Sequence, residues 1–230
     1  MKDLFFLLTI IKRSDSLEYE NFYNDEGITV CFSTPCNGTA HEKTLTILGI
    51  EKTEKTMLFS TVTGATLKRL CKRLTNVMKI DLPDRGVAVA VPLSGIGGSR
   101  ALGYLTEGQE ITKDGEEFIM ESSHELIVAI YEKGYTKLVM DAARDAGAGG
   151  GTTIHAKGTG AGAERFFGMS IAEEKEMVFI VSHTDKKKDI MSAIMSKAGI
   201  DSKAHAVVFS LPVAATAGFR FADTVSKDEE

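Results

Sequence analysis

The stretch LIVAIYEKGYTKLVMDAARDAG, residues 126–147, contains a strand pattern followed by a helix pattern. Residues 126–131 are a continuous apolar run of strand length. After them, Leu138, Ala142 and Ala146 recur at helical spacing, and Gly147 is placed to end the helix. A strand that runs into an amphipathic helix predicts the first half of an α+β unit.

The chain downstream of this stretch supplies the rest of the unit. TTIHA (152–156) and EMVFIVS (176–182) are expected to be strands, and HAVVFSLPV (205–213) is expected to be the last one. Between the last two, Thr184 is placed to cap a helix. The apolar stripe of that helix consists of Ile190, Met191, Ile194, Met195 and Ala198. The predicted order is βαββαβ.

The same pattern occurs 120 residues earlier. Met57-Leu58-Phe59 corresponds to Met177-Val178-Phe179, and the apolar run 6–11 corresponds to 126–131. The same offset joins three further pairs, which are Gly38 with Gly158, Pro92 with Pro212 and Gly98 with Gly218. One constant offset at several separate places indicates a tandem duplication. We expect one domain at 1–102, a linker at 103–122 that is able to form a hairpin, and a second domain at 123–230.

A βαββαβ unit forms a four-stranded antiparallel sheet with both helices on one face, a ferredoxin-like sandwich. The predicted fold class is therefore α+β, with two such sandwiches in tandem. The strands are apolar on both alternating faces, so the face without helices must also be covered. We expect sheet faces to associate, within the chain or between copies in a homo-oligomer.

Charge and composition exclude several classes of function. The formal net charge is −5, and the lysines of DKKKD (185–189) stand between aspartates, so no nucleic-acid surface is expected. The apolar start of the chain is too short to span a bilayer, which favours a cytoplasmic protein without membrane insertion. Cys31, Cys36 and Cys71 lack the spacing of a metal site and are expected to be reduced thiols.

The segment IHAKGTGAGAERFFG, residues 154–168, is the main candidate for a binding site. Glycines allow successive backbone N–H groups to turn toward an anion, and the neighbouring Lys157 and Arg165 carry positive charge. The alternative is a turn between two strands that binds nothing. The residues alone leave both readings open.

Taken together, AGAGGGTTIHAKGTG, EKEMVFIVSHTDKKKDI and AVVFSLPV resemble the PII signal-transduction family, the nitrogen-regulatory proteins. The resemblance covers nearly all of the second domain and extends more faintly through the first. It implies the ferredoxin-like fold, a trimeric arrangement of such domains, and binding of ATP or ADP as effector. It also implies a loop after the second strand that regulates a protein partner, a transporter or an enzyme, without catalysis.

The family's Lys-Gly-x-Gly pattern is matched by Lys157, Gly158, Thr159 and Gly160, with Arg165 close by. In the second domain its phosphate-binding turn before the last strand keeps only Asp201 and Lys203, because the glycine spacing is lost, and in the first domain Asp84, Arg85 and Gly86 match it in part. No tyrosine occurs between Gly158 and Glu176, so the modification known in some members has no acceptor. In the first domain, Gly38 and Thr39 are the corresponding candidate effector-binding residues.

Three functional hypotheses remain. The first is a PII-like regulator, in nitrogen or related metabolism, that senses a small anionic effector such as an adenine nucleotide. The second is an interaction or structural module of the same fold that has lost its effector site. The third, an enzyme, is disfavoured because the sequence has no paired nucleophile and base, no metal cluster and no carboxylate pair.

Overall fold

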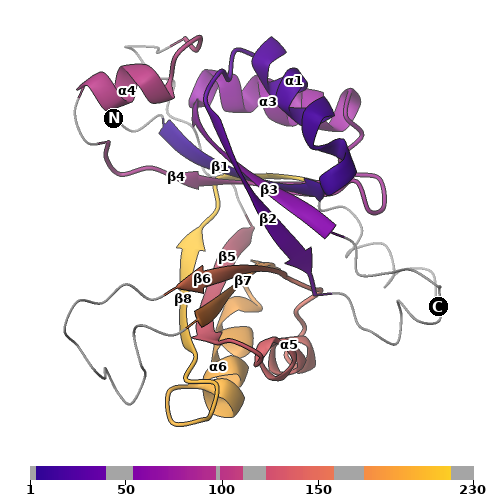
Figure 1. Ribbon diagram of the computed structural model, residues 1–230, viewed down its shortest axis with the longest axis vertical. Helices are drawn as coiled ribbons and strands as arrows, with labels where there is room; N and C mark the ends of the chain where they lie inside the picture. Colours follow the sequence, from indigo (N-terminus) through magenta and orange to yellow (C-terminus); the bar gives the residue numbers. More distant parts are fainter. Residues whose placement is uncertain (1–3, 40–53, 97–98, 111–122, 158–173, 219–230) are drawn as a thin grey trace. The chain divides into compact units, whose positions relative to one another are not determined.

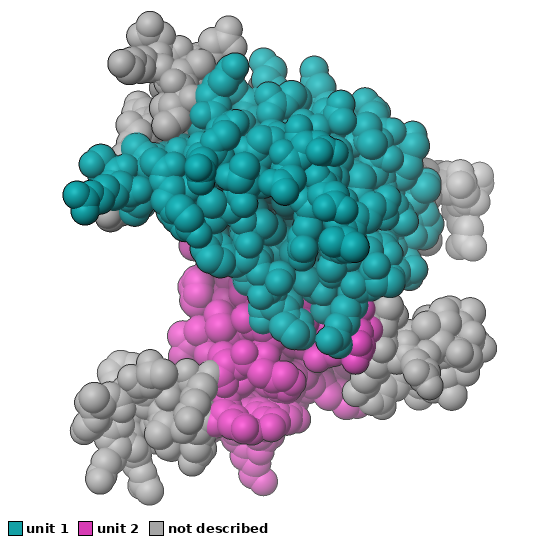
Figure 2. Space-filling model, turned by 45° about the horizontal axis from the view of Figure 1, so that its top comes forward, with its two compact units in different colours: residues 1–35, 55–122, 212–230 teal, residues 36–54, 123–211 magenta. Residues whose placement is uncertain are grey.

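The computed structural model describes residues 4–39, 54–96, 99–110, 123–157 and 174–218. The chain divides into two compact units, which Figure 2 colours separately. Unit 1 contains residues 1–35, 55–122 and 212–230, and unit 2 contains residues 36–54 and 123–211. Each unit is described below by itself.

Unit 1 is a sandwich of helices on an antiparallel sheet (Figure 1). Its elements are β1 (Leu4–Lys12), the 3-10 turn η1 (Arg13–Asp15), α1 (Ser16–Asp25), β2 (Cys31–Gly38), β3 (Glu54–Thr63), α3 (Gly64–Asn76), β4 (Gly86–Pro92), α4 (Ser99–Leu105) and β9 (Ala215–Ala217). The strand order is β2-β3-β1-β4-β9, and α1 and α3 lie on the same face of the sheet. Without β9, this is the order expected of a ferredoxin-like unit.

Unit 2 has the same plan. Its elements are β5 (His124–Glu132), α5 (Thr136–Asp145), β6 (Thr152–Lys157), β7 (Glu174–His183), α6 (Lys187–Ala198) and β8 (Val207–Pro212). The strand order is β8-β5-β7-β6, with α5 and α6 on one face (Figure 1). The last residues of β2 add to the free edge of β6, since Asn37 pairs with Thr153 and Gly38 with Thr152. The α+β class and the βαββαβ order are therefore confirmed.

The offset of 120 residues holds for the elements themselves. It separates the starts of β1 and β5, of α1 and α5, and of β3 and β7. The helix-ending glycines follow the same rule, because Gly27 and Gly147 both have positive φ, at 81° and 94°. The offset found between residues of the sequence thus also separates the starts of these elements.

Each unit has its own core between the sheet and the helices. In unit 1, Leu67, Leu70 and Leu74, which share one side of α3 at i, i+3 and i+7, are fully buried. In unit 2, Ile190, Ile194 and Ala198 of α6 are fully buried. Burial extends to the face without helices as well. On that face Leu8, Ile10, Met57, Val89, Leu126 and Val128 are buried.

Some details differ from the sequence-based expectations. In α5 the buried residues are Val139, Met140, Ala142 and Ala143, while Leu138 is 37% exposed. Of the predicted stripe, Ala142 is fully buried and Ala146 packs partly buried against the core, so only Leu138 lies outside it. Likewise Met195 of α6 is exposed. Thr184 does not cap α6, because that helix begins at Lys187 after a turn and its N-cap is Lys186.

The compact units also differ from the expected domain limits of 102 and 123. Residues 36–54 belong to unit 2 and residues 212–230 belong to unit 1. Within the expected linker, the described residues continue α4 into a turn at 106–109. The expected hairpin falls mostly on residues 111–122, which lie outside the described part of the chain.

Candidate functional site

Most of the predicted glycine segment lies between Lys157 and Glu174, two residues that are paired on the unit 2 sheet. β6 and β7 are antiparallel neighbours, and Lys157, the last residue of β6, pairs with Glu174, the first residue of β7. Gly158, Thr159, Gly160 and Arg165 lie outside the described residues. The structure therefore fixes the two ends of the segment, which are side by side on the sheet.

Charged side chains surround this end of the sheet. Lys133 Nζ donates a hydrogen bond to Glu174 Oε2, and Lys175 Nζ donates one to Glu132 Oε1. The hydrogen bond and charge of Glu174 raise the pKa of Lys133. Lys175 is buried, and a buried ammonium needs such a partner because the charge has lost its hydration. These pairs place charged side chains of both signs at the base of the segment.

Glu176 occupies a polar corner beside these pairs. Its Oε2 atom accepts hydrogen bonds from the Thr136 hydroxyl at 2.6 Å and from the backbone N–H of Gly134 at 3.2 Å. His155 Nδ1 lies 3.8 Å from Glu176 Oε1, and the two residues are paired across β6 and β7. The hydroxyl groups of Tyr131 and Thr136 are 3.0 Å apart. A carboxylate is thus held in place where β5 runs into α5.

Asp201 and Lys203 lie in the exposed turn between α6 and β8. This turn is tied to the sheet, since the backbone N–H of Glu132 donates to the carbonyl of Ala204 at 3.0 Å. In the register of the sheet, Glu132 of β5 lies opposite Lys175 of β7, and Lys175 lies opposite Ala156 of β6. By register, the turn and Lys157 therefore lie at the same end of the unit 2 sheet.

Gly38 and Thr39 lie at the opposite end of β6. The Thr39 hydroxyl donates to the Gly151 carbonyl and accepts from the Gly151 N–H, both at 2.9 Å. The Arg144 guanidinium also donates to the Thr39 carbonyl. Thr152 and Lys157 are five residues apart, about 16 Å along a strand. The structure thus places Lys157, Asp201 and Lys203 at the same end of the unit 2 sheet, and Gly38 and Thr39 at the other end.

Sequence reasoning missed the polar residues just inside this end of the sheet, Glu132, Lys175 and Glu176. A signal was present, because EKEM at 174–177 repeats EKTM at 54–57. By itself, the repeated motif predicts only the start of a strand. The two copies differ at one position, where Glu176 corresponds to Thr56, and this difference indicates the polar corner of unit 2.

Metal-binding clusters and membrane-spanning helices are both absent from the described residues. No group of three or more His, Cys, Asp or Glu side chains in the described ranges is arranged to hold a metal ion. Among the same residues, no helix is both long enough and apolar enough to cross a membrane. Cys31, Cys36 and Cys71 form no disulfide among the described residues.

The second half of the chain matches known proteins. Residues 124–222 match the family model described as nitrogen regulatory protein P-II. Among solved structures, the chain is similar to Arabidopsis thaliana PII bound to citrate, with 21% sequence identity and a TM-score of 0.32, over 42% of this chain and 80% of that chain. No curated protein matches the chain. The family resemblance of the second repeat is confirmed by the family model.

Proposed function

Because residues 124–222 belong to the nitrogen regulatory protein P-II family, we propose that this chain is a regulatory protein. It senses a small anionic effector, with ATP or ADP as the first candidates, and in response regulates a partner protein such as a transporter or an enzyme. Its role is regulatory and not catalytic. A setting in nitrogen or related metabolism and a cytoplasmic location are part of the same proposal.

One observation carries this proposal. Within the matched region, Lys157 closes β6 at the start of the Lys-Gly-Thr-Gly run, and the turn with Asp201 and Lys203 lies at the same end of the sheet. The proposed effector site consists of Lys157, Gly158, Thr159, Gly160 and Arg165 together with this turn. Two lysines and a run of backbone N–H groups are suited to the oxygens of a phosphate.

The first repeat contributes less to this site. Gly38 and Thr39 were predicted to be its effector-binding residues, and the hydroxyl of Thr39 both donates to and accepts from Gly151. An effector at these two residues would have to compete with those hydrogen bonds. We therefore test effector binding at the second repeat first.

To regulate a partner, the effector must bind one state of the protein more tightly than another. A difference of about 1–3 kcal/mol is sufficient for a useful switch. Lys157 and Glu174 hold the two ends of the segment 158–173. A phosphate bound at Lys157 would act at one of these ends, and this is how we propose that the signal is passed on.

The test is isothermal calorimetry and thermal unfolding with ATP, ADP, AMP and 2-oxoglutarate. At a ligand concentration 100 times the dissociation constant, binding stabilises the folded state by about 2.7 kcal/mol. Gly158→Val and Gly160→Val should abolish this stabilisation. The matched control is Gly150→Ala, because a Cβ at Gly150 meets no atom within 4 Å.

If no ligand of this panel binds, the proposal of an effector sensor is wrong and the interaction module is favoured. The lost glycine spacing of the phosphate turn is the observation that keeps this second candidate open. Turnover of a ligand would instead indicate an enzyme. Sedimentation analysis tests the proposed homo-oligomer separately.

A further inference from the structure

Helix α3 of unit 1 has a strongly basic outer side, in a chain whose formal net charge is −5. Its sequence, GATLKRLCKRLTN, contains lysines and arginines but no aspartate or glutamate. The basic residues are all exposed, and they are Lys68, Arg69, Lys72 and Arg73. They form two pairs at i and i+4, so the members of each pair lie one turn apart along the helix. We call these residues the basic face.

Only part of this charge is balanced within unit 1. Arg69 Nε lies 3.1 Å from Glu26 Oε2, and Arg69 Nη2 donates to the Glu26 carbonyl at 2.7 Å. Arg73 Nε pairs with Glu26 Oε1, and its guanidinium lies 5.9 Å from the centre of the Phe22 ring. The two lysines of the basic face form no ion pair with any described residue. Within the described part of the chain, the carboxylate of Glu26 alone is paired with the basic face.

The second repeat shows that the fold does not need this charge. The offset of 120 relates α3 to α6, since Leu70 corresponds to Ile190 and Leu74 to Ile194, and all of them are fully buried. The positions of the basic face correspond in α6 to Lys188, Asp189, Ser192 and Ala193. The same helix position of unit 2 thus carries one cation and one carboxylate.

Packing and helix stability do not explain the basic face either. Like charges at i and i+4 repel each other, so the ammonium groups of Lys68 and Lys72 disfavour the helix. The other side of α3 already supplies the contact with the core, through Leu67, Leu70 and Leu74. A local arrangement that opposes folding is expected at a functional surface, and here it suits a partner of opposite charge.

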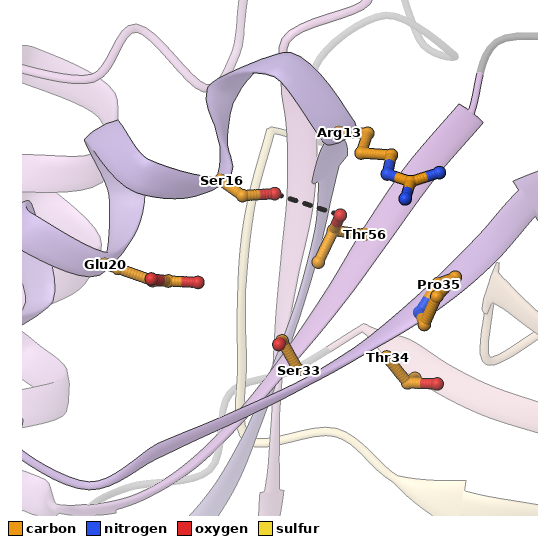
Figure 3. A pocket seen from close by; sticks show the side chains of 7 residues that line it. All are labelled: Arg13, Ser16, Glu20, Ser33, Thr34, Pro35 and Thr56. Carbon is orange, nitrogen blue, oxygen red and sulfur yellow. Dashed lines mark hydrogen bonds between the residues drawn. The ribbon is translucent and has the colours of Figure 1, made fainter.

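The neighbouring helix restricts the kind of partner. The contacts of both arginines place α1 next to α3, on the same face of the sheet (Figure 1). The exposed carboxylates of α1 are Glu18, Glu20 and Asp25. Figure 3 shows Glu20 at a polar cavity of about 300 Å³ at the start of α1, where Ser16 donates to Thr56 at 2.9 Å. A long polyanion such as a nucleic acid would meet these carboxylates, whereas a short acidic segment along α3 would not.

We propose that the basic face of α3 is the docking surface for an acidic helical segment of a partner protein. Carboxylates at i and i+4 of that segment pair with Lys68 and Lys72. The side chains of Arg69 and Arg73 are 52% and 47% exposed and supply further donors. The existence of a partner rests on the proposed regulatory function, but the basic face is in unit 1, whereas the proposed effector site at Lys157 is in unit 2.

The experiment is fluorescence anisotropy of the full chain with a labelled probe peptide. The probe is an alanine-rich helix of about 15 residues with glutamates at i and i+4, and its control has glutamine at the same positions. We expect the glutamate peptide to bind and the glutamine peptide not to bind. Binding should weaken when NaCl is raised from about 0.01 M to about 0.1 M, because the Debye length falls from about 30 Å to about 10 Å.

Lys68→Glu combined with Lys72→Glu should weaken peptide binding at least about tenfold, because attraction becomes repulsion. The matched control is Lys186→Glu combined with Lys188→Glu, which makes the same charge change on exposed lysines at the start of α6. We expect this control to change the affinity less than about twofold, since its charges lie in the other unit. Circular dichroism and the unfolding midpoint check that both variants fold. If the charge-reversed α3 variant does not fold, the same two positions changed to glutamine decide the question.

Several outcomes would overturn the proposal. They are no binding of the glutamate peptide, equal losses in the α3 and α6 variants, and binding of oligothymidylate as tight as that of the peptide. A salt-dependent dimer that the α3 variant dissociates in sedimentation analysis would also overturn it, in favour of a second copy of this chain. A chain that binds ATP but not the peptide contradicts the basic face alone. A chain that binds the peptide but no nucleotide supports the basic face and contradicts the effector site alone.

Discussion

The side chain of Gln109 is hydrogen bonded to the backbone of Thr63, where β3 ends. Gln109 Oε1 accepts from the N–H of Thr63 at 3.0 Å, and its Nε2 donates to the carbonyl of Thr61 at 2.7 Å. One amide thus satisfies two backbone groups at the start of α3, where Thr63 also accepts from the N–H of Thr66. A residue of the expected linker is in this way part of unit 1.

We predict that Gln109→Ala lowers the free energy of unfolding of unit 1 by about 1–3 kcal/mol, because it leaves two half-buried backbone groups without partners. Urea unfolding followed by circular dichroism measures the change. Glu107→Ala is the control, because Glu107 bonds through its backbone: its N–H donates to the Tyr104 carbonyl at 3.3 Å and its carbonyl accepts from the Thr29 hydroxyl at 3.1 Å. Equal effects of the two substitutions would contradict the assigned role of Gln109.

A second prediction concerns Glu26, whose carboxylate is almost fully buried. Arg69 Nε lies 3.1 Å from Glu26 Oε2, and Arg73 Nε pairs with Oε1. We expect Glu26→Ala to destabilise unit 1 by about 2–3 kcal/mol, below the full cost of breaking a buried pair, because both arginines are half exposed and regain water. Lys72→Ala on α3 is the control, with an expected change within about 0.5 kcal/mol in urea unfolding.

The repeat explains how much of the fold could be predicted. Strand and helix patterns 120 residues apart support each other, so the βαββαβ order was predictable even where one copy is faint. Local periodicity was sufficient for α3, whose leucines lie on one side. It was insufficient for α5, because Leu138 and Val139 compete for the core and only the packed sheet decides between them.

The rest depends on contacts that are distant in the sequence. The pairing of Asn37 and Gly38 with β6, and of β9 with β4, joins residues more than 100 positions apart, and no local pattern reports it. The same holds for the candidate site. The sequence names Lys157, Asp201 and Lys203 as candidates, but that they lie at one end of the sheet follows from the register of β5, β6 and β7.

A third prediction follows from β9, the short strand that pairs with β4 in unit 1. Gly218 ends it with a φ of 83°, and a Cβ there would lie 2.4 Å from the carbonyl oxygen of Gly86. We expect Gly218→Val to destabilise unit 1 by at least about 2 kcal/mol, from backbone strain and this clash. Hydrogen exchange of the β4 amides should increase in parallel. Gly103→Ala in α4, where a Cβ meets no atom within 4 Å, should not show this loss.

The fourth prediction is a loss of stability at alkaline pH. Burial raises the pKa of Tyr19 from 10.0 to about 12, and burial also raises the pKa values of Tyr23 and Tyr131. A raised pKa in the folded state means that the stabilisation is complete below pH 10 and is lost as the pH rises through about 12. Unfolding midpoints measured across this range should fall together with the rise of tyrosinate absorbance.

Tyr19→Phe separates this effect from general alkaline damage. The hydroxyl of Tyr19 is buried and has no hydrogen-bond partner among the described residues, so its removal should cost little at pH 7. Above pH 10 the variant should be more stable than the wild type, because one buried group no longer has to ionise. Tyr23→Phe, which removes the 2.5 Å hydrogen bond to Thr9, should instead lower stability at pH 7. A Tyr19→Phe variant that loses stability above pH 10 as steeply as the wild type would show that ionisation of this tyrosine does not limit the fold.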